Sequence, residues 1–261
     1  TVEEIDAASI QACEVNGITD GYVRPVAWRG SEMMGVSAQS NKINVAIAAW
    51  EWPSYFSPEA RMNGIKLQIS KWKRPSPETE PVHAKAAGLY MICTLSKHTA
   101  EAAGYQDALM LDYRGQIAEA TGANIFFVMS DGKLHTPKPD CFLDGITRRT
   151  VIDLAKKRGV DVVERAIMPE EMADASECFL TGTAAEVTPV SEIGPYSFQV
   201  DAISEEEFQE RFGHVPEEEL RGFNTTAVDV NQIAVVDGLQ AEVLEQRVTA
   251  RFEGVGNLRE I

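Results

Sequence analysis

Residues 107–136, DALMLDYRGQIAEATGANIFFVMSDGKLHT, predict a meander of short β-strands. Runs rich in apolar residues are separated by turn-forming residues, and the runs cover 107–112, 116–119, 124–129 and 133–136. The clearest turns are Arg114-Gly115 and Asp131-Gly132, and Asp-Gly is typical of tight hairpins. Consecutive strands joined by such short turns favour antiparallel pairing.

The segments on both sides of this meander add helices and further strands. Capping residues and apolar periodicity predict helices over 1–16, 57–63, 88–103 and 144–158, with a short one from Pro169. Further strands are predicted over 21–28, 42–52, 65–72, 160–165 and 177–181. In the first of these, Pro25 favours an edge position or a bulge. Antiparallel strands with segregated helices predict an α+β fold.

Composition bounds the class of protein. The chain has 261 residues and a net charge of −16, which argues against nucleic acid and anionic membranes as main partners. Four scattered cysteines without a C-x-x-C pair favour free thiols in a reducing cytoplasm rather than a disulfide framework or a metal site. No apolar run has the ~20 residues of a membrane span. The chain begins at Thr1, in the first turn of the first predicted helix, and we expect an upstream segment to precede it.

Residues 201–261 differ in charge from the rest of the chain. They hold 14 acidic residues, 5 arginines and no lysine. Ser204-Glu205-Glu206-Glu207 resembles a capping-box start, a second helix is expected after Pro216, and 239–251 has helix-like apolar spacing. We expect an acidic helical tail of unknown role, as a docking or solvated extension.

Lys85 is the first candidate for chemistry. It lies in His83-Ala84-Lys85-Ala86-Ala87-Gly88-Leu89-Tyr90, a stretch of small and apolar residues. Desolvation there would lower the pKa of the lysine, and a neutral amine attacks aldehydes. The alternative is a surface lysine in an alanine-rich helix.

Three further motifs suggest what Lys85 serves. Glu119 ends an apolar strand. It is either a solvated residue at the strand end or a carboxylate that keeps a heterocyclic nitrogen protonated. Asp144-Gly145-Ile146-Thr147 opens a helix, as a plain N-cap or as a phosphate site. Thr181-Gly182-Thr183-Ala184-Ala185-Glu186 is a simple turn or a second anion site. Together with Lys85, these features suit pyridoxal 5′-phosphate (PLP).

The chain resembles the class IV, fold-type IV PLP-dependent aminotransferases (the D-amino acid aminotransferase-like fold), and most of all their branched-chain amino acid aminotransferases. The matching motifs occur in family order over residues 1–200. They are Tyr22-Val23-Arg24-Pro25, Met34-Gly35-Val36, Trp52-Pro53-Ser54-Tyr55, Lys85–Tyr90, Gly104–Leu109, Glu119–Phe127, Gly145-Ile146-Thr147-Arg148 and Thr181–Pro189.

The resemblance implies a role for each matching residue. Lys85 would be the Schiff-base lysine and proton carrier, Tyr90 the phenol near the cofactor's 3-oxygen, and Glu119 the acid on the pyridine nitrogen. The phosphate would lie on Ile146, Thr147 and Thr183. The substrate α-carboxylate would contact Tyr22 and the backbone of Thr183 and Ala184, and the second carboxylate of glutamate would contact Arg24. Trp52 and Tyr55 would line the side-chain pocket, although ordinary core aromatics and a structural Arg24 are the alternatives.

The resemblance also implies an organisation and a reaction. Residues 1–75 would end a small N-terminal lobe and form the interdomain region, residues 76–200 would form the large PLP-binding domain, and 201–261 the acidic tail. The reaction would be transamination of leucine, isoleucine or valine with 2-oxoglutarate by a cytoplasmic homodimer, with amino acids and 2-keto acids as partners and no metal.

Three departures from the family pattern leave alternatives open. The family's N-terminal lobe, which carries an arginine for the phosphate, is absent from this sequence. Ala123 stands where many members have glutamate, and the tail does not match the family's ending. The alternatives are a D-amino acid or (R)-amine transaminase, an aminodeoxychorismate lyase of the same fold, or a truncated inactive chain with a structural or binding role.

Overall fold

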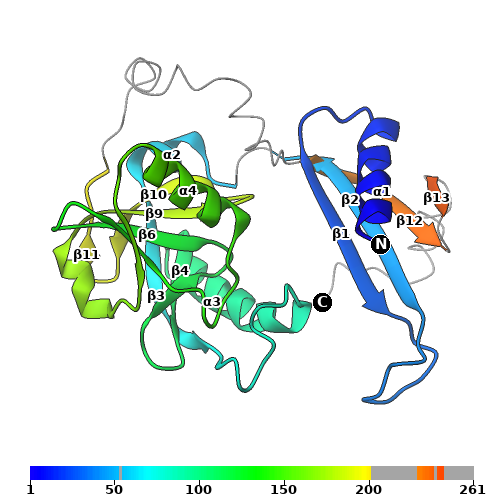
Figure 1. Ribbon diagram of the computed structural model, residues 1–261, viewed down its shortest axis with the longest axis horizontal. Helices are drawn as coiled ribbons and strands as arrows, with labels where there is room; N and C mark the ends of the chain where they lie inside the picture. Colours follow the sequence, from blue (N-terminus) through cyan, green and yellow to red (C-terminus); the bar gives the residue numbers. More distant parts are fainter. Residues whose placement is uncertain (53–54, 201–227, 238–239, 244–261) are drawn as a thin grey trace. The chain divides into compact units, whose positions relative to one another are not determined.

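The computed structural model describes residues 1–52, 55–200, 228–237 and 240–243 (Figure 1). The described residues divide into two compact units. The first unit holds residues 1–52 with two strands from the C-terminal region, and the second holds residues 55–200. The strand that begins at Ile65 belongs to the sheet of the second unit, so this unit includes part of the stretch 1–75 that we expected to form the end of the N-terminal lobe and the interdomain region.

The first unit is a four-stranded antiparallel sheet with one helix. The helix is α1 (Val2–Val15), and the strand order is β1 (Tyr22–Arg29), β2 (Ile43–Glu51), β12 (Val228–Asp237), β13 (Gln240–Val243). As expected, Thr1 and Glu4 form a capping box at the start of α1. Pro25 lies in the edge strand β1, where its missing N–H interrupts no inner ladder.

Strands β12 and β13 correct the expectation for the C-terminal region. Residues 240–243 fall within the helix expected over 239–251, and they form a strand that pairs with β12. The sequence of β12, VDVNQIAVVD, is rich in β-branched residues, which favour strands over helices. The helices expected from Ser204 and after Pro216 lie outside the described residues.

The second unit is built on a nine-stranded mixed sheet. The strand order is β5-β4-β3-β10-β9-β6-β7-β8, and β11 pairs with β10. The strands are β3 (Ile65–Arg74), β4 (Asp107–Asp112), β5 (Ile117–Ala120), β6 (Asn124–Met129), β7 (Leu134–Pro137), β8 (Val162–Arg165), β9 (Ala175–Gly182), β10 (Glu186–Ile193) and β11 (Tyr196–Ser197). The hairpins β4–β5 and β6–β7 are antiparallel as expected, whereas β3–β4, β3–β10 and β7–β8 are parallel pairs.

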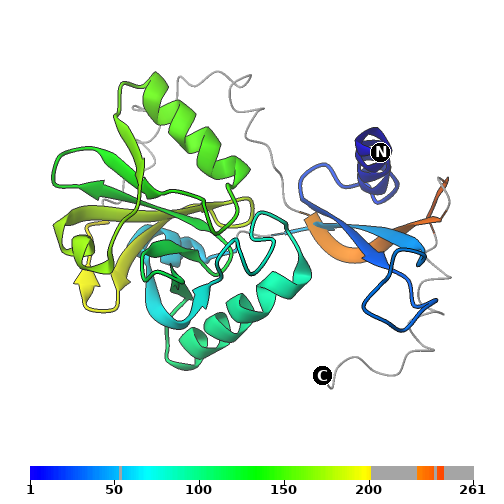
Figure 2. The same cartoon turned by 60° about the horizontal axis from the view of Figure 1, so that its bottom comes forward.

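Helices cover both sides of this sheet. Figure 2 shows α3 (Met91–Ala102) and α4 (Ile146–Lys157) on opposite sides of the strands. The shorter helices are α2 (Pro58–Asn63), η1 (Ala87–Tyr90) and η2 (Pro169–Asp174). None of the described helices combines the length and the apolar character needed to cross a bilayer.

The core of the second unit lies among the central strands. Leu67, Ile125, Leu180 and Val190 come from four different strands and are fully buried in one cluster. Each such side chain contributes roughly 1.5–3 kcal/mol through burial. The central strands are therefore held firmly, and the turns that leave them can place polar groups reproducibly.

Candidate functional site

Glu119 is a buried carboxylate at the end of the β4–β5 hairpin. It stands on β5 opposite Met110, and its exposed fraction is 7%. Arg74 Nε, at the end of β3, lies 3.4 Å from Glu119 Oε1, and Asn124 Nδ2 donates to Oε2 at 3.2 Å. Of the two alternatives for Glu119, the solvated strand end is wrong, because the neighbouring strands enclose this side chain.

Burial raises the pKa of Glu119 to about 8, above its ordinary value of 4.5. The charges of Arg74 and Lys85 oppose this rise without cancelling it. Near neutral pH the group therefore holds a proton until a further cation reaches it. A protonated heterocyclic nitrogen is such a cation.

Lys85 and Tyr90 form the next part of the site. Lys85 follows a turn, and Tyr90 ends η1 just before α3. Lys85 Nζ donates to the Tyr90 hydroxyl at 3.1 Å. The Lys85 side chain is exposed, so the expected desolvation by its small apolar neighbours does not occur. Its proximity to Tyr90 and Glu119, rather than its burial, distinguishes it.

The start of α4 presents free backbone N–H groups. Gly145 is the N-cap residue, and no side chain of the described residues caps this end. Asp144, which could have served as the cap, pairs instead with Arg148 at 2.8 Å. Ile146 is exposed and Thr147 half-buried at this end. The first turn of α4 therefore retains N–H groups that suit an anion.

The turn between β9 and β10 lies beside the turn between β5 and β6. A Cβ built on Gly182 would stand 3.5 Å from Ala123 Cβ and from Gly122 O. Thr183 is exposed in this turn, next to the half-buried Ala184. Just before it, Thr181 is 1% exposed, and within the described residues its Oγ1 has no hydrogen-bond partner. Thr181 pairs directly with Asn124, so the two side chains share one face of the sheet.

Tyr22, Arg24 and Trp52 gather in the first unit. Arg24 Nη2 donates to the Tyr22 hydroxyl at 3.4 Å, and the guanidinium lies 5.1 Å from the Tyr22 ring centre. Tyr22 and Trp52 have ring centres 5.9 Å apart, and both contact Trp50. Tyr55 belongs to the second unit, where its ring meets Phe56 edge-on at 4.9 Å.

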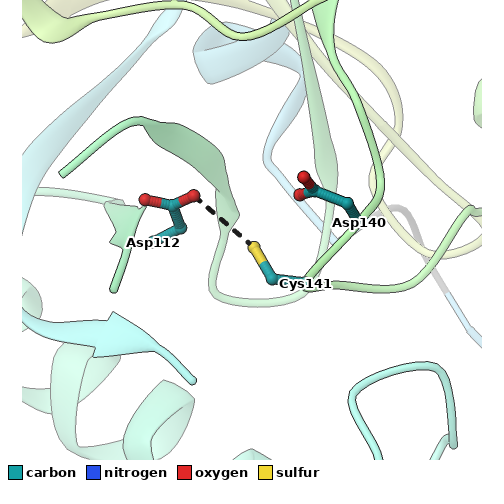
Figure 3. Close-up of side chains that lie close together, drawn as sticks. All are labelled: Asp112, Asp140 and Cys141. Atoms are coloured by element: carbon teal, nitrogen blue, oxygen red, sulfur yellow. Dashed lines mark hydrogen bonds between the residues drawn. The ribbon is translucent and has the colours of Figure 1, made fainter. Parts of the chain in front are cut away.

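A separate acidic cluster lies on the second unit (Figure 3). Asp112, Asp140 and Cys141 bring three potential metal-ligand atoms within 4.8 Å of one another. Arg114 already neutralises this cluster, since Nε donates to Asp112 Oδ2 at 2.7 Å and Nη2 donates to both Asp140 oxygens at 2.9 Å. Burial, reinforced by the two carboxylates, raises the pKa of Cys141 to about 12, so the thiol stays protonated. The cluster is accounted for by its ion pairs with Arg114.

Sequence reasoning did not single out Arg74, Asn124 or Trp50. Arg74 closes a strand of alternating polarity, and nothing nearby in the sequence distinguishes it from a solvated arginine. Asn124 follows a Gly-Ala turn and reads as a turn residue. Trp50 pairs with Tyr22 in the register of β1 with β2, and the alternation of β2 alone does not reveal that pairing.

Comparison with known families decides which class of protein carries this arrangement. The model of the family "Amino-transferase class IV" matches residues 2–193. The chain belongs to the class IV aminotransferases. This class IV chain therefore has the mixed α+β fold expected from its sequence.

Curated relatives and solved structures agree with this family. The probable branched-chain-amino-acid aminotransferase of Rickettsia bellii is 45% identical over 192 residues, which are 74% of this chain and 65% of the relative. The crystal structure of the Escherichia coli branched-chain amino acid aminotransferase matches with a TM-score of 0.76 and 35% identity, covering 84% of this chain and 73% of that one. The T.th. branched-chain amino acid aminotransferase, solved with pyridoxamine 5′-phosphate, matches with a TM-score of 0.73 and 37% identity, covering 84% and 74%. The chain thus spans just under two thirds of the length of the curated relative.

Proposed function

We propose that this chain is the main part of a PLP-dependent aminotransferase that converts leucine, isoleucine and valine to their 2-keto acids. The amino group would pass to 2-oxoglutarate, giving glutamate. The observation that carries the proposal is the grouping of Lys85, Tyr90 and Glu119 in one unit that also holds the uncapped start of α4. The names of the similar aminotransferases support the substrate class.

The residues present fit PLP at three points. The buried Glu119 carboxyl needs a cation to ionise, which the protonated ring nitrogen of PLP supplies. The start of α4 has no side-chain cap among the described residues, and the Thr181 hydroxyl nearby has no partner there, which suits a phosphate. Lys85 is exposed, so its amine can reach an aldehyde carbon.

Each of these residues then has a task. Lys85 Nζ would hold the cofactor at its aldehyde carbon and would take the α-proton of the substrate. Tyr90 would orient Nζ through their hydrogen bond. Glu119 would keep the ring nitrogen protonated, and Ile146, Thr147 and Thr183 would hold the phosphate. PLP, when bound, delocalises the electron pair that the α-proton leaves behind.

We infer substrate contacts for the remaining residues. Tyr22 and the backbone of Thr183 and Ala184 would bind the α-carboxylate, and Arg24 the second carboxylate of glutamate. Trp52 and Tyr55 would line the pocket for the apolar side chain, which suits leucine, isoleucine and valine.

A homodimer in the cytoplasm is part of the proposal. Trp28 on β1 is 47% exposed, and Met34 and Val36 in the following loop are fully exposed, which is typical of a surface that a partner covers. We expect Trp28→Glu to shift the mass measured by light scattering towards the monomer, with Arg29→Glu on the same strand as the control. Equal masses for wild type and both variants would contradict the proposal that a partner covers this surface.

The cysteines bear on the compartment. All four are free, which supports a reducing compartment such as the cytoplasm.

The test of the proposed function is a pair of measurements on the same chain. PLP should give wild type a visible absorbance band that Lys85→Ala lacks. Coupled assays with L-leucine, D-alanine and an (R)-amine should then give the highest rate with L-leucine. Absence of the band in wild type, or its survival in Lys85→Ala, would refute cofactor attachment. A D-alanine rate far above the L-leucine rate would refute the substrate class.

A further inference from the structure

Asn124 connects two parts of the site that are far apart in the sequence. Its Nδ2 donates to Glu119 Oε2 at 3.2 Å and to Leu143 O at 3.0 Å. Its Oδ1 accepts the Gly145 N–H at 3.2 Å. The side chain is buried and lies at the start of β6. One amide thus contacts both the buried carboxyl and the residue that caps α4.

Gly145 shows how tightly this connection is built. A Cβ at position 145 would stand 2.4 Å from Asn124 Oδ1, closer than non-bonded atoms approach. The backbone of Gly145 has φ −62°, which any residue can adopt, so the glycine is required by the contact and not by the backbone angle. The Asn124 amide and the start of α4 therefore fix each other's positions.

We propose that Asn124 is a positioning residue that holds the Glu119 carboxyl and the first turn of α4 at a fixed separation. The ring nitrogen and the phosphate of one cofactor molecule can then bind at the same time. This inference rests on the proposed function. It follows from the rigidity of the three contacts, since two binding groups at a fixed spacing act as one bidentate site. Loss of Asn124 would leave each group present and would loosen the distance between them.

Loss of Asn124 should weaken the binding of PLP by more than it weakens the binding of the ring and of the phosphate taken separately. PLP carries both binding groups, pyridoxal carries the ring without the phosphate, and inorganic phosphate carries the anion alone. In Asn124→Ala we expect the dissociation constant of PLP to rise by about tenfold or more. The rises for pyridoxal and for phosphate should each stay below about threefold. Calorimetric titration of the full chain with each of the three probes measures these ratios.

Two further variants keep the test independent of folding. Gly145→Ala displaces the Asn124 amide without removing it, and it should reproduce the selective loss of PLP affinity. Asn124→Asp keeps the size of the side chain but replaces the donor with an acceptor that faces Glu119, and it should lose PLP affinity as well. Asn41→Ala is the matched control, because Asn41 is also buried and donates to the backbone at Gly30 O, in the other unit. Its PLP affinity should equal that of wild type, and urea unfolding should show which variants are folded.

The outcomes separate this inference from the proposed function. For each folded variant, the fold-increase in the dissociation constant of PLP is compared with the product of the fold-increases for pyridoxal and for phosphate. If the PLP value did not exceed that product, Asn124 would have a purely structural role and the inference would be overturned. An equal loss of PLP affinity in Asn41→Ala would overturn it too. If wild type itself failed to bind PLP at Lys85, the proposed function would fail first, and the inference with it.

Discussion

The carboxyl of Glu119 makes the stability of the cofactor-free chain depend on pH. Burial raises its pKa to about 8 in the folded chain, against 4.5 ordinarily, so the folded chain retains a proton that the unfolded chain has released. Stability that is fully present below the ordinary value is therefore lost as the pH rises through the folded value. Between about pH 5 and about pH 9, we expect the free energy of unfolding to fall by on the order of a few kcal/mol through this group alone.

Glu119→Gln isolates this effect. The amide keeps the shape and cannot ionise, so the fall in stability between the two pH values should be smaller in the variant than in wild type. Urea unfolding of both proteins at both pH values measures the difference. Parallel pH profiles would show that Glu119 is ionised in the folded chain at both pH values, and would contradict the raised pKa. Saturating PLP should also flatten the wild-type profile, because the ring cation lowers the pKa of Glu119.

At the residue scale, the sequence singled out the groups that we propose carry the chemistry, and it did not single out the side chains that contact them. Lys85 and Glu119 stand in short local motifs that resemble a family. Arg74 and Asn124 act on Glu119 through side-chain contacts across three strands, and no local pattern encodes such contacts. Lys85 is exposed instead of covered as we expected, because its small apolar neighbours do not enclose it between the turn that it follows and η1.

A buried arginine anchors helix α4 to the sheet, beside the apolar contacts of Ile152 with Phe126 and Leu134. Arg148 is 1% exposed and binds Asp144 at 2.8 Å, Glu164 at 2.7 Å and Pro137 O at 3.0 Å. Because its removal leaves the Pro137 carbonyl without its donor and breaks ion pairs with two half-exposed carboxylates, Arg148→Ala should lower the free energy of unfolding by about 1–3 kcal/mol. Arg149 is its neighbour, with a largely exposed side chain, and Arg149→Ala should change stability by less than about 0.5 kcal/mol. Equal urea midpoints for the two variants would contradict this anchoring.

At the element scale, strands and helices were largely predictable, whereas their partners were not. The hairpins β4–β5 and β6–β7 follow from turn dipeptides, and the start of α1 follows from its capping box. The single meander that we expected is wrong, because β5 and β6 do not pair. The parallel pairs of β3 were missed, because alternation within a strand does not specify its neighbours. Strand β10 was missed, because Pro189 lies inside it and proline argues against a strand between two neighbours.

At the scale of the whole molecule, we propose that Arg24 of the first unit binds the second carboxylate of glutamate and takes no part in holding the cofactor. Arg24→Gln should therefore leave PLP affinity unchanged and raise the KM for 2-oxoglutarate by about tenfold or more, the loss typical of one charged hydrogen bond. Its KM for L-leucine should change less. Arg29→Gln, on the same strand, should leave both KM values at the wild-type level. An equal rise for 2-oxoglutarate and L-leucine in Arg24→Gln would show that Arg24 does not distinguish the two substrates.

The division into units and the pairing of strands that are far apart in the sequence were the features least predictable from the sequence. The family resemblance covers residues 1–200, and it groups residues 55–75 with the N-terminal lobe and the interdomain region, whereas in the structure these residues belong to the second unit. The helical reading of residues 239–251 relied on apolar spacing, which a short strand also satisfies. Long-range pairing such as β12 with β2 has no local signature.

The central claim is that Lys85 carries PLP, and chemical trapping tests it most directly. The chain is incubated with PLP, reduced with borohydride, digested, and its peptides are analysed by mass spectrometry. We predict one stoichiometric modification, on Lys85, that disappears when L-leucine is added before reduction, because the substrate amine then takes the place of the lysine. Labelling spread over several exposed lysines, or labelling of Lys85 that L-leucine leaves unchanged, would contradict the account.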